Sequence, residues 1–170
     1  MHPYVKLAIQ AVRHFLLKGE ILPCPDSLPN EMNRQLGTFV SIKKKINGEL
    51  RGCIGTVSPN QDNLAKEIIQ NAVNAATRDP RFIPIVINEL DQFLFSVDVL
   101  TPLEFIDKPE QLNPKQYGLS IKYGKHQGIL LPNLEGIDSV QRQIYLCLKK
   151  GNIKKNVDYQ MYRFEVERYR

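Results

Sequence analysis

The stretch TFVSIKKKINGELRGCIGTV, residues 38–57, consists of two runs rich in apolar and β-branched residues on either side of Asn47-Gly48. The dipeptide Asn-Gly between two such runs is a strong local signal for a β-hairpin. We therefore predict strands over 38–46 and 49–57, joined by a two-residue turn.

The register of this hairpin determines which side chains share a face of the sheet. With a two-residue turn, Ile42 pairs with Cys53 and Lys44 pairs with Arg51, so that all four lie on one face. A β-bulge would shift the pairing by one residue and turn these side chains to the other face. The prediction therefore depends on a regular ladder.

Hydrophobic periodicity predicts the remaining elements. Helices are expected over 3–18, 62–77 and 138–150, and strands over 92–101, 117–123, 127–131 and 159–168. The connection 20–36 contains three prolines and is expected to be a long loop. Strands outnumber helices and do not alternate regularly with them, which predicts an α+β fold with about three main helices.

The composition is that of an ordinary globular chain. The 170 residues include 42% hydrophobic and 24% charged residues, and a chain of this size buries roughly two thirds of the surface of its unfolded form. Intrinsic disorder, collagen and a disulfide-stapled scaffold are therefore excluded. No run approaches the ~18 apolar residues of a membrane helix, and the N-terminus lacks a signal segment. We expect a single domain over 1–170, located in the cytoplasm without membrane attachment.

The charge of the chain is mildly basic. It is +5, from 23 Lys and Arg against 18 Asp and Glu. A basic surface is compatible with nucleic-acid association, but no helix-turn-helix, aromatic RNA-binding motif or zinc finger accompanies it. Nucleic-acid association is therefore kept only as a lesser alternative.

The cysteines and histidines predict neither disulfides nor a metal site. Cys24, Cys53 and Cys147 are odd in number and form no C-x-x-C, which indicates a reducing compartment. No histidine pairs with another ligand at zinc spacing, and no phosphate-binding loop is present, so that no metal and no cofactor is predicted. We expect no role for Cys24, and we expect Cys147 in the core.

The hexapeptide LRGCIG, residues 50–55, is unusual for a strand. Gly52 and Gly55 pack no side chain, and they are tolerated where the backbone bends or where another group approaches closely. In a regular strand Arg51 shares the face of Cys53, where a cation favours thiolate over thiol. The pattern predicts a thiol or anion site, with Cys53 as nucleophile and Arg51 as its electrostatic support. The alternative is a small buried cysteine in a bulged strand.

A second group of charged residues, Arg78, Asp79 and Arg81, follows the predicted helix 62–77. Arg81 has the chemistry to bind a carboxylate bidentately. One interpretation is an anion clamp facing the LRGCIG strand. The other is a turn that docks the helix against the sheet.

Two more side chains are assigned to these groups. Glu67, on the same helix, is predicted to pair with Arg51 or Arg81. His126 is a candidate base for Cys53, because a nucleophilic cysteine normally needs a means of staying ionised. The alternative for His126 is a loop histidine in solvent.

LRGCIG is also the signature of the AMMECR domain family, and further stretches of the chain resemble that family in the same order. They are AATRDPRF (75–82), SVDVLTP (96–102), GILLP (128–132) and CLKKG (147–151), where Lys150 replaces the usual alanine. The chain is identified as a member of this family over essentially its whole length. The resemblance implies a cytoplasmic α+β domain with a larger and a smaller lobe around a mixed or antiparallel sheet.

The resemblance also implies partners. Prokaryotic relatives look like component A of a system that includes a Memo-like protein and a radical SAM protein. S-adenosylmethionine and an iron–sulfur cluster would then belong to that partner, because this chain lacks a three-cysteine cluster motif.

Together these patterns predict a ligand- or substrate-binding site for a small molecule or peptide, centred on the LRGCIG strand and dependent on a thiol. The alternative is a non-catalytic adaptor for a radical SAM or Memo-like partner. Whether the protein is an enzyme is left open. The candidate catalytic residues are Cys53, Arg51 and His126, and the candidate binding residues are Arg51, Gly52, Ile54, Gly55, Arg78, Asp79 and Arg81.

Overall fold

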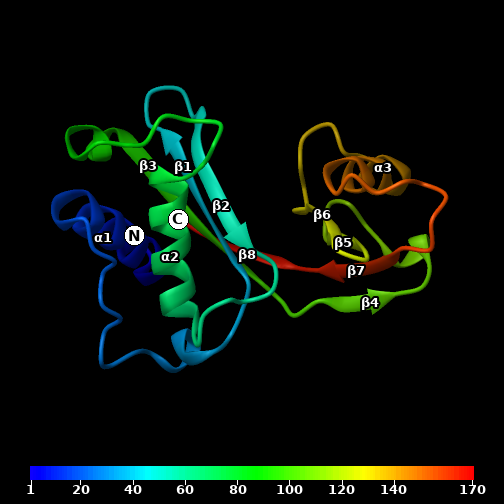
Figure 1. Ribbon diagram of the computed structural model, residues 1–170, viewed down its shortest axis with the longest axis horizontal. Coiled ribbons are helices and arrows are strands. Elements are labelled where there is room, and N and C mark those ends of the chain that lie inside the picture. Colours follow the sequence, from blue (N-terminus) through cyan, green and yellow to red (C-terminus); the bar gives the residue numbers. More distant parts are fainter. The chain divides into compact units, whose positions relative to one another are not determined.

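The computed structural model describes residues 1–170. The chain forms two compact units, Met1–Val99 with Glu167–Arg170, and Leu100–Val166. Each unit contains a four-stranded sheet and helical segments, which confirms the α+β class (Figure 1). None of the helices has the length and apolar character needed to cross a membrane.

Helix α1 (Pro3–Lys18) has the bounds that the sequence predicts. At its start the His2 side chain accepts a hydrogen bond from the Tyr4 N–H at 3.3 Å, and Pro3 occupies the first turn. At its end Gly19 adopts the left-handed conformation, with φ 74°, and donates its N–H to the Phe15 carbonyl.

The first unit is a sheet with the strand order β2-β1-β3-β8 and two helices on one side. Its elements are β1 (Thr38–Lys44), β2 (Leu50–Thr56), α2 (Leu64–Thr77), β3 (Phe93–Leu100) and β8 (Val166–Tyr169), with short 3-10 segments η1 (Asn30–Asn33) and η2 (Ile87–Gln92). Helix α2 packs on β1 and β2, and α1 packs on α2 (Figure 1). The sheet face beneath them buries Val40, Ile42 and Val97 completely. We call the opposite face of this sheet the helix-free face.

The connection between β1 and β2 is longer than predicted. It is a four-residue loop, 45–48, because the Lys44 N–H bonds to the Glu49 carbonyl at 2.9 Å. Gly48 takes a φ of 72° in this loop, and the Asn47 side chain accepts a hydrogen bond from the Glu49 N–H. The two-residue turn was therefore the wrong prediction, although the hairpin itself is present.

A bulge at Arg51 shifts the rest of the ladder. Gly52 lies opposite Ile42, and Cys53 lies opposite Ser41. The predicted Ile42–Cys53 and Lys44–Arg51 pairs are therefore wrong. Because side chains alternate along a strand, this one-residue shift turns Cys53 to the helix-free face.

The predicted strand 159–168 consists of two strands that belong to different sheets. β7 (Gln160–Phe164) lies in the second unit and β8 in the first, with Glu165 between them. Glu165 donates its N–H to the Thr101 hydroxyl at 2.9 Å and accepts from the Thr101 N–H at 3.0 Å. The alternation of apolar residues continues through this point, so that the sequence pattern did not reveal the change of sheet.

The second unit is a sheet with the strand order β4-β7-β5-β6, covered by one helix. Its further elements are β4 (Glu104–Ile106), η3 (Pro109–Gln111), β5 (Gly118–Tyr123), β6 (His126–Leu130) and α3 (Val140–Lys150). Cys147 of α3 is buried against the sheet and donates its thiol to the Leu119 carbonyl at 3.4 Å. Burial raises the pKa of Cys147 to about 12. The predicted core position of Cys147 is confirmed.

Candidate functional site

The helix-free face of the first sheet carries a row of three small polar side chains. Ser41 lies opposite Cys53 on one side and opposite Ser96 on the other, so that β2, β1 and β3 each contribute one residue. The Ser41 hydroxyl donates a hydrogen bond to the Cys53 sulfur at 3.2 Å. Cys53 is only partly buried. The thiol of the LRGCIG strand thus has a fixed hydrogen-bond donor beside it.

The backbone of Cys53 is held by two side chains that follow α2. The N–H and carbonyl groups of Cys53 bond to side chains and not to β1, and because β2 is an edge strand no further strand lies on that side. The Cys53 N–H donates to Asp79 Oδ2 at 2.9 Å, and the Cys53 carbonyl accepts from Arg81 Nη2 at 3.2 Å. Asp79 and Arg81 also pair bidentately, with distances of 2.9 and 2.7 Å. The charged group therefore docks the end of α2 on β2, and Arg81 remains half-exposed next to Cys53.

Three cations surround this row. Arg168 of β8 pairs bidentately with the buried Asp98 of β3, at 2.7 Å for both contacts. The hydrogen bond to its aspartate raises the pKa of Arg81 and of Arg168, and negative charge on Cys53 raises each further. Both guanidinium groups therefore lie within electrostatic range of the thiol. Lys43, exposed two residues along β1 from Ser41, is the third cation.

The Asp79–Arg81 pair predicts acid sensitivity of the first unit. The hydrogen bond from Arg81, supported by the backbone N–H groups of Cys53 and Arg81, lowers the pKa of Asp79 from 3.8 to about 2. A depressed pKa means that this carboxylate contributes stability above pH 3.8, and that the contribution is lost as the pH falls towards 2. We expect Asp79→Asn to be less stable than the wild type near neutral pH, with a difference that shrinks through this window. Urea unfolding curves at a series of pH values measure it, and a difference that does not depend on pH would contradict it.

Arg51 does not lie beside Cys53. Its guanidinium carbon lies 5.7 Å from the centre of the Phe93 ring, on the side of the sheet that the helices cover, and its Nη1 is buried without a hydrogen-bond partner. The bulge causes this placement, since Arg51 is the extra residue of the ladder. Arg81 and Arg168, and not Arg51, are the cations that interact electrostatically with Cys53.

The two glycines of the motif are explained by packing within the first unit. A Cβ atom on Gly52 would overlap the backbone carbonyl of Ala75 in α2, and one on Gly55 would overlap the ring of Phe39. The close approach that these glycines permit is therefore made by the protein itself. Ile54 pairs with Val40 and packs against the core.

The structure places the remaining predicted residues as follows. Arg78 is the exposed residue that ends α2. Glu67 is buried and accepts hydrogen bonds from the N–H groups of Asn60 and Gln61, so the predicted pairing with Arg51 or Arg81 is wrong. His126 is exposed at the start of β6 in the second unit. The Cys53–His126 dyad stays a prediction.

Sequence reasoning missed Ser41, Ser96, Asp98 and Arg168. One signal was available: Asp98 lies in the apolar stretch FLFSVDVL, and a carboxylate in a central strand requires a partner. Strand alternation also places Ser96 and Asp98 on one face. Nothing in the local sequence names Arg168 as the partner, because 70 residues separate the two.

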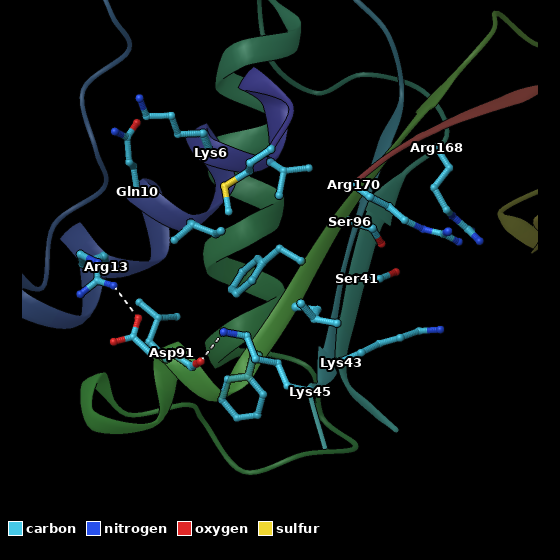
Figure 2. Close-up of a pocket in the computed structure, with 17 residues that line it drawn as sticks. Lys6, Gln10, Arg13, Ser41, Lys43, Lys45, Asp91, Ser96, Arg168 and Arg170 are labelled. Carbon is cyan, nitrogen blue, oxygen red and sulfur yellow. Dashed lines mark hydrogen bonds and ion pairs between the residues drawn. The ribbon is translucent and has the colours of Figure 1, made fainter. Parts of the chain in front are cut away.

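A cavity of about 770 Å³ lies beside the row. Ser41, Ser96 and Arg168 line it, while Lys6, Gln10 and Arg13 of α1 line its other side (Figure 2). The hydroxyl that contacts the Cys53 sulfur therefore also borders a space large enough for a ligand. No three His, Cys, Asp or Glu side chains lie together in a way that could hold a metal ion.

Comparisons with known proteins identify the family to which the chain is similar. The AMMECR1 family model matches residues 5–169. A protein of Thermotoga maritima is 43% identical over 171 residues, covering 99% of this chain and 98% of its own length. A protein of Clostridium acetobutylicum is 44% identical over 170 residues, but this chain spans only 36% of its length. The crystal structure of an uncharacterized protein from Pyrococcus horikoshii matches with a TM-score of 0.89 at 28% identity, over 97% of this chain and 88% of that one. The chain belongs to the AMMECR1 family.

Proposed function

We propose that the protein binds a small molecule or peptide on the helix-free face of its first sheet, with Cys53 as the reacting thiol. One observation carries this proposal: the Cys53 sulfur accepts a hydrogen bond from Ser41, while the backbone of Cys53 is held by Asp79 and Arg81. A free cysteine in a core behaves as a small hydrophobic residue with a weak S–H donor. Cys147 differs from Cys53 in that it is fully buried and its thiol donates to the Leu119 carbonyl, whereas Cys53 is partly exposed and its sulfur accepts a hydrogen bond.

The charges around Cys53 indicate the class of ligand. Arg81 and Lys43 are exposed, and Arg168 keeps 45% of its side-chain surface accessible. Cations that are not fully covered favour an anion next to them. The proposed ligand therefore carries a carboxylate or phosphate group close to the atom that the thiol attacks. We place this reaction in the cytoplasm, where Cys53 stays reduced.

The proposal predicts that Cys53 reacts preferentially with an anionic alkylating agent. In the folded protein the Cys53 thiolate displaces iodide from iodoacetate or from neutral iodoacetamide. We expect the ratio of the two rates to be about three- to tenfold higher at Cys53 than at Cys24, because nearby cations concentrate the anion. Peptide mass spectrometry of the modified cysteines over time measures both rates in one sample.

Two controls belong to this experiment. Buried Cys147 should stay unmodified until urea unfolds the protein. High salt should reduce the preference of Cys53 for iodoacetate, because screening weakens the attraction. If Cys53 reacts only after unfolding, it is a packing residue and the proposed thiol chemistry is wrong. If it reacts with both reagents in the same ratio as Cys24, the anionic ligand is wrong.

A second candidate function is a non-catalytic adaptor for a radical SAM or Memo-like protein. It is favoured by the Clostridium acetobutylicum relative, of which this chain spans only 36%, so that the homologous region there is joined to further chain. Cys53→Ser distinguishes the two functions. It should leave the binding of a purified partner unchanged if the domain is an adaptor, and should abolish turnover if the thiol reacts.

A further inference from the structure

Strand β3 has a neighbour along only part of its outer edge. On one side β1 pairs with it from Phe93 to Val99. On the other side lies β8, which has four residues and whose Arg168 bonds to Asp98 near the end of β3. The first half of β3 therefore borders the 770 Å³ cavity instead of a strand. An exposed strand edge of this kind is a template for pairing with another chain.

The backbone groups of Phe95 point to this edge. The Lys45 N–H bonds to the Gln92 carbonyl at 2.9 Å and continues the β1–β3 register. Because hydrogen-bonded pairs alternate in an antiparallel ladder, the groups of Phe93 and Phe95 are directed away from β1. The Phe93 N–H donates a hydrogen bond to the Leu90 carbonyl. The carbonyls of Phe93 and Phe95 and the Phe95 N–H are left for a further strand.

The two sides of the cavity differ in character. Ile9 of α1 provides apolar surface on the helix side. Ser41, Lys43 and Ser96 line the helix-free side (Figure 2), together with the exposed side chain of Leu94. A strand added to β3 would point alternate side chains to these two sides. One set of its side chains would meet apolar surface, and the other set would meet hydroxyl and ammonium groups beside Leu94.

The charge of the cavity lining is strongly positive. Its only acidic side chain, Asp91, is already paired with Arg13 at 2.9 Å. Its cationic side chains are Lys6, Arg13, Lys43, Lys45, Arg168 and Arg170. Of these, Lys6, Lys43, Lys45 and Arg170 form no ion pair with another side chain. An acidic partner would therefore be favoured over a neutral or basic one.

We propose that the first half of β3 binds an extended segment of a partner protein in which apolar and acidic side chains alternate. The segment adds a strand to the sheet at Phe95, places its apolar side chains against α1, and places its carboxylates near Lys43. Main-chain hydrogen bonds supply affinity in such complexes, and the alternate side chains supply specificity. This site goes beyond the proposed function and does not rest on the reactivity of Cys53.

A labelled nine-residue peptide that alternates valine and glutamate tests the proposal by fluorescence anisotropy with the full chain. We expect it to bind at least about tenfold more tightly than the same peptide with lysine in place of glutamate. A version with proline at the centre should also bind at least about tenfold more weakly, because proline lacks an N–H for the ladder. Lys43→Glu should weaken binding, while Lys125→Glu, in the exposed β5–β6 loop, serves as the matched control.

Hydrogen exchange of the Phe95 amide provides a second measurement. It should exchange quickly in the free protein and slowly in the complex, because the added strand supplies its carbonyl partner. Cys53→Ala should bind the peptide as the wild type does, so that failure of the thiol chemistry and failure of this site are distinguishable.

Several results would overturn the proposal. Equal binding of the glutamate and lysine peptides would contradict the preference for an acidic partner. Equal binding of the proline peptide would contradict the addition of a strand. Full competition by free glutamate would assign the site to a small anion. Protection of Phe95 without peptide, together with dimerisation of the chain, would assign the edge to a second copy.

Discussion

Gly52→Val is expected to lower the free energy of unfolding of the first unit by at least about 3 kcal/mol. A Cβ atom at this position would overlap the backbone carbonyl of Ala75 in α2. The position of the Cβ atom is fixed by the backbone of β2, and the carbonyl belongs to the backbone of α2. The overlap is therefore relieved only if β2 and α2 separate and the core between them opens. A urea titration followed by circular dichroism measures the loss.

Gly48→Asn is the matched control in the same hairpin. Gly48 has a φ of 72°, and a Cβ atom there would meet nothing within 4 Å. Asparagine tolerates the left-handed region, and we expect a loss below about 1 kcal/mol. Equal stability of the two variants would mean that β2 does not lie against α2. A binding defect in a Gly52 variant would report damage to the fold and not a lost ligand contact.

Glu67→Ala is expected to cost about 3 kcal/mol or more. This carboxylate is 1% exposed and accepts hydrogen bonds from the N–H groups of Asn60 and Gln61, each at 2.8 Å, and from the Thr56 hydroxyl. Alanine would leave these donors without a partner in the connection from β2 to α2. Thermal or urea unfolding of the variant measures the effect.

Glu20→Ala, at an exposed position after α1, is the control for loss of one acidic side chain. Its stability should lie within about 0.5 kcal/mol of the wild type. Glu67→Gln should fall between the two, since the amide keeps one acceptor oxygen but directs a donor at groups that also donate. A Glu67→Ala variant as stable as Glu20→Ala would show that the loop finds other partners for these groups.

Most elements could be predicted from the sequence because their ends carry local signals. Pro3 and Gly19 mark both ends of α1. For α2 and α3 the predicted starts are two residues early. The structure explains this difference: Asn63 and Ser139 are the capping residues, each accepting a hydrogen bond from the N–H three residues ahead. A periodic pattern does not distinguish such a cap from the first residue of the helix.

The candidate site could be predicted only in part. Cys53 and the Asp79–Arg81 group stand out locally, and the structure brings them together. The neighbours of the thiol do not stand out in the local sequence, because they depend on the register of three strands. That register is set by the four-residue loop at 45–48 and by the bulge at Arg51, which move every later residue to the other face. Arg51 finds the Phe93 ring across the sheet, and no local pattern shows this contact.

The division of the last stretch between β7 and β8 has a consequence for the order of assembly. The first unit is discontinuous, since its fourth strand follows some 70 residues of chain that belong mainly to the second unit. During synthesis on the ribosome, residues 1–99 emerge before β8. They contain only three strands of the sheet, and Asp98 has no ion-pair partner until Arg168 is made. Closing this long loop makes β8 a late, high-contact-order step. Until it is made, the whole outer edge of β3 is available to other chains, so that the nascent protein has most need of a chaperone at this strand.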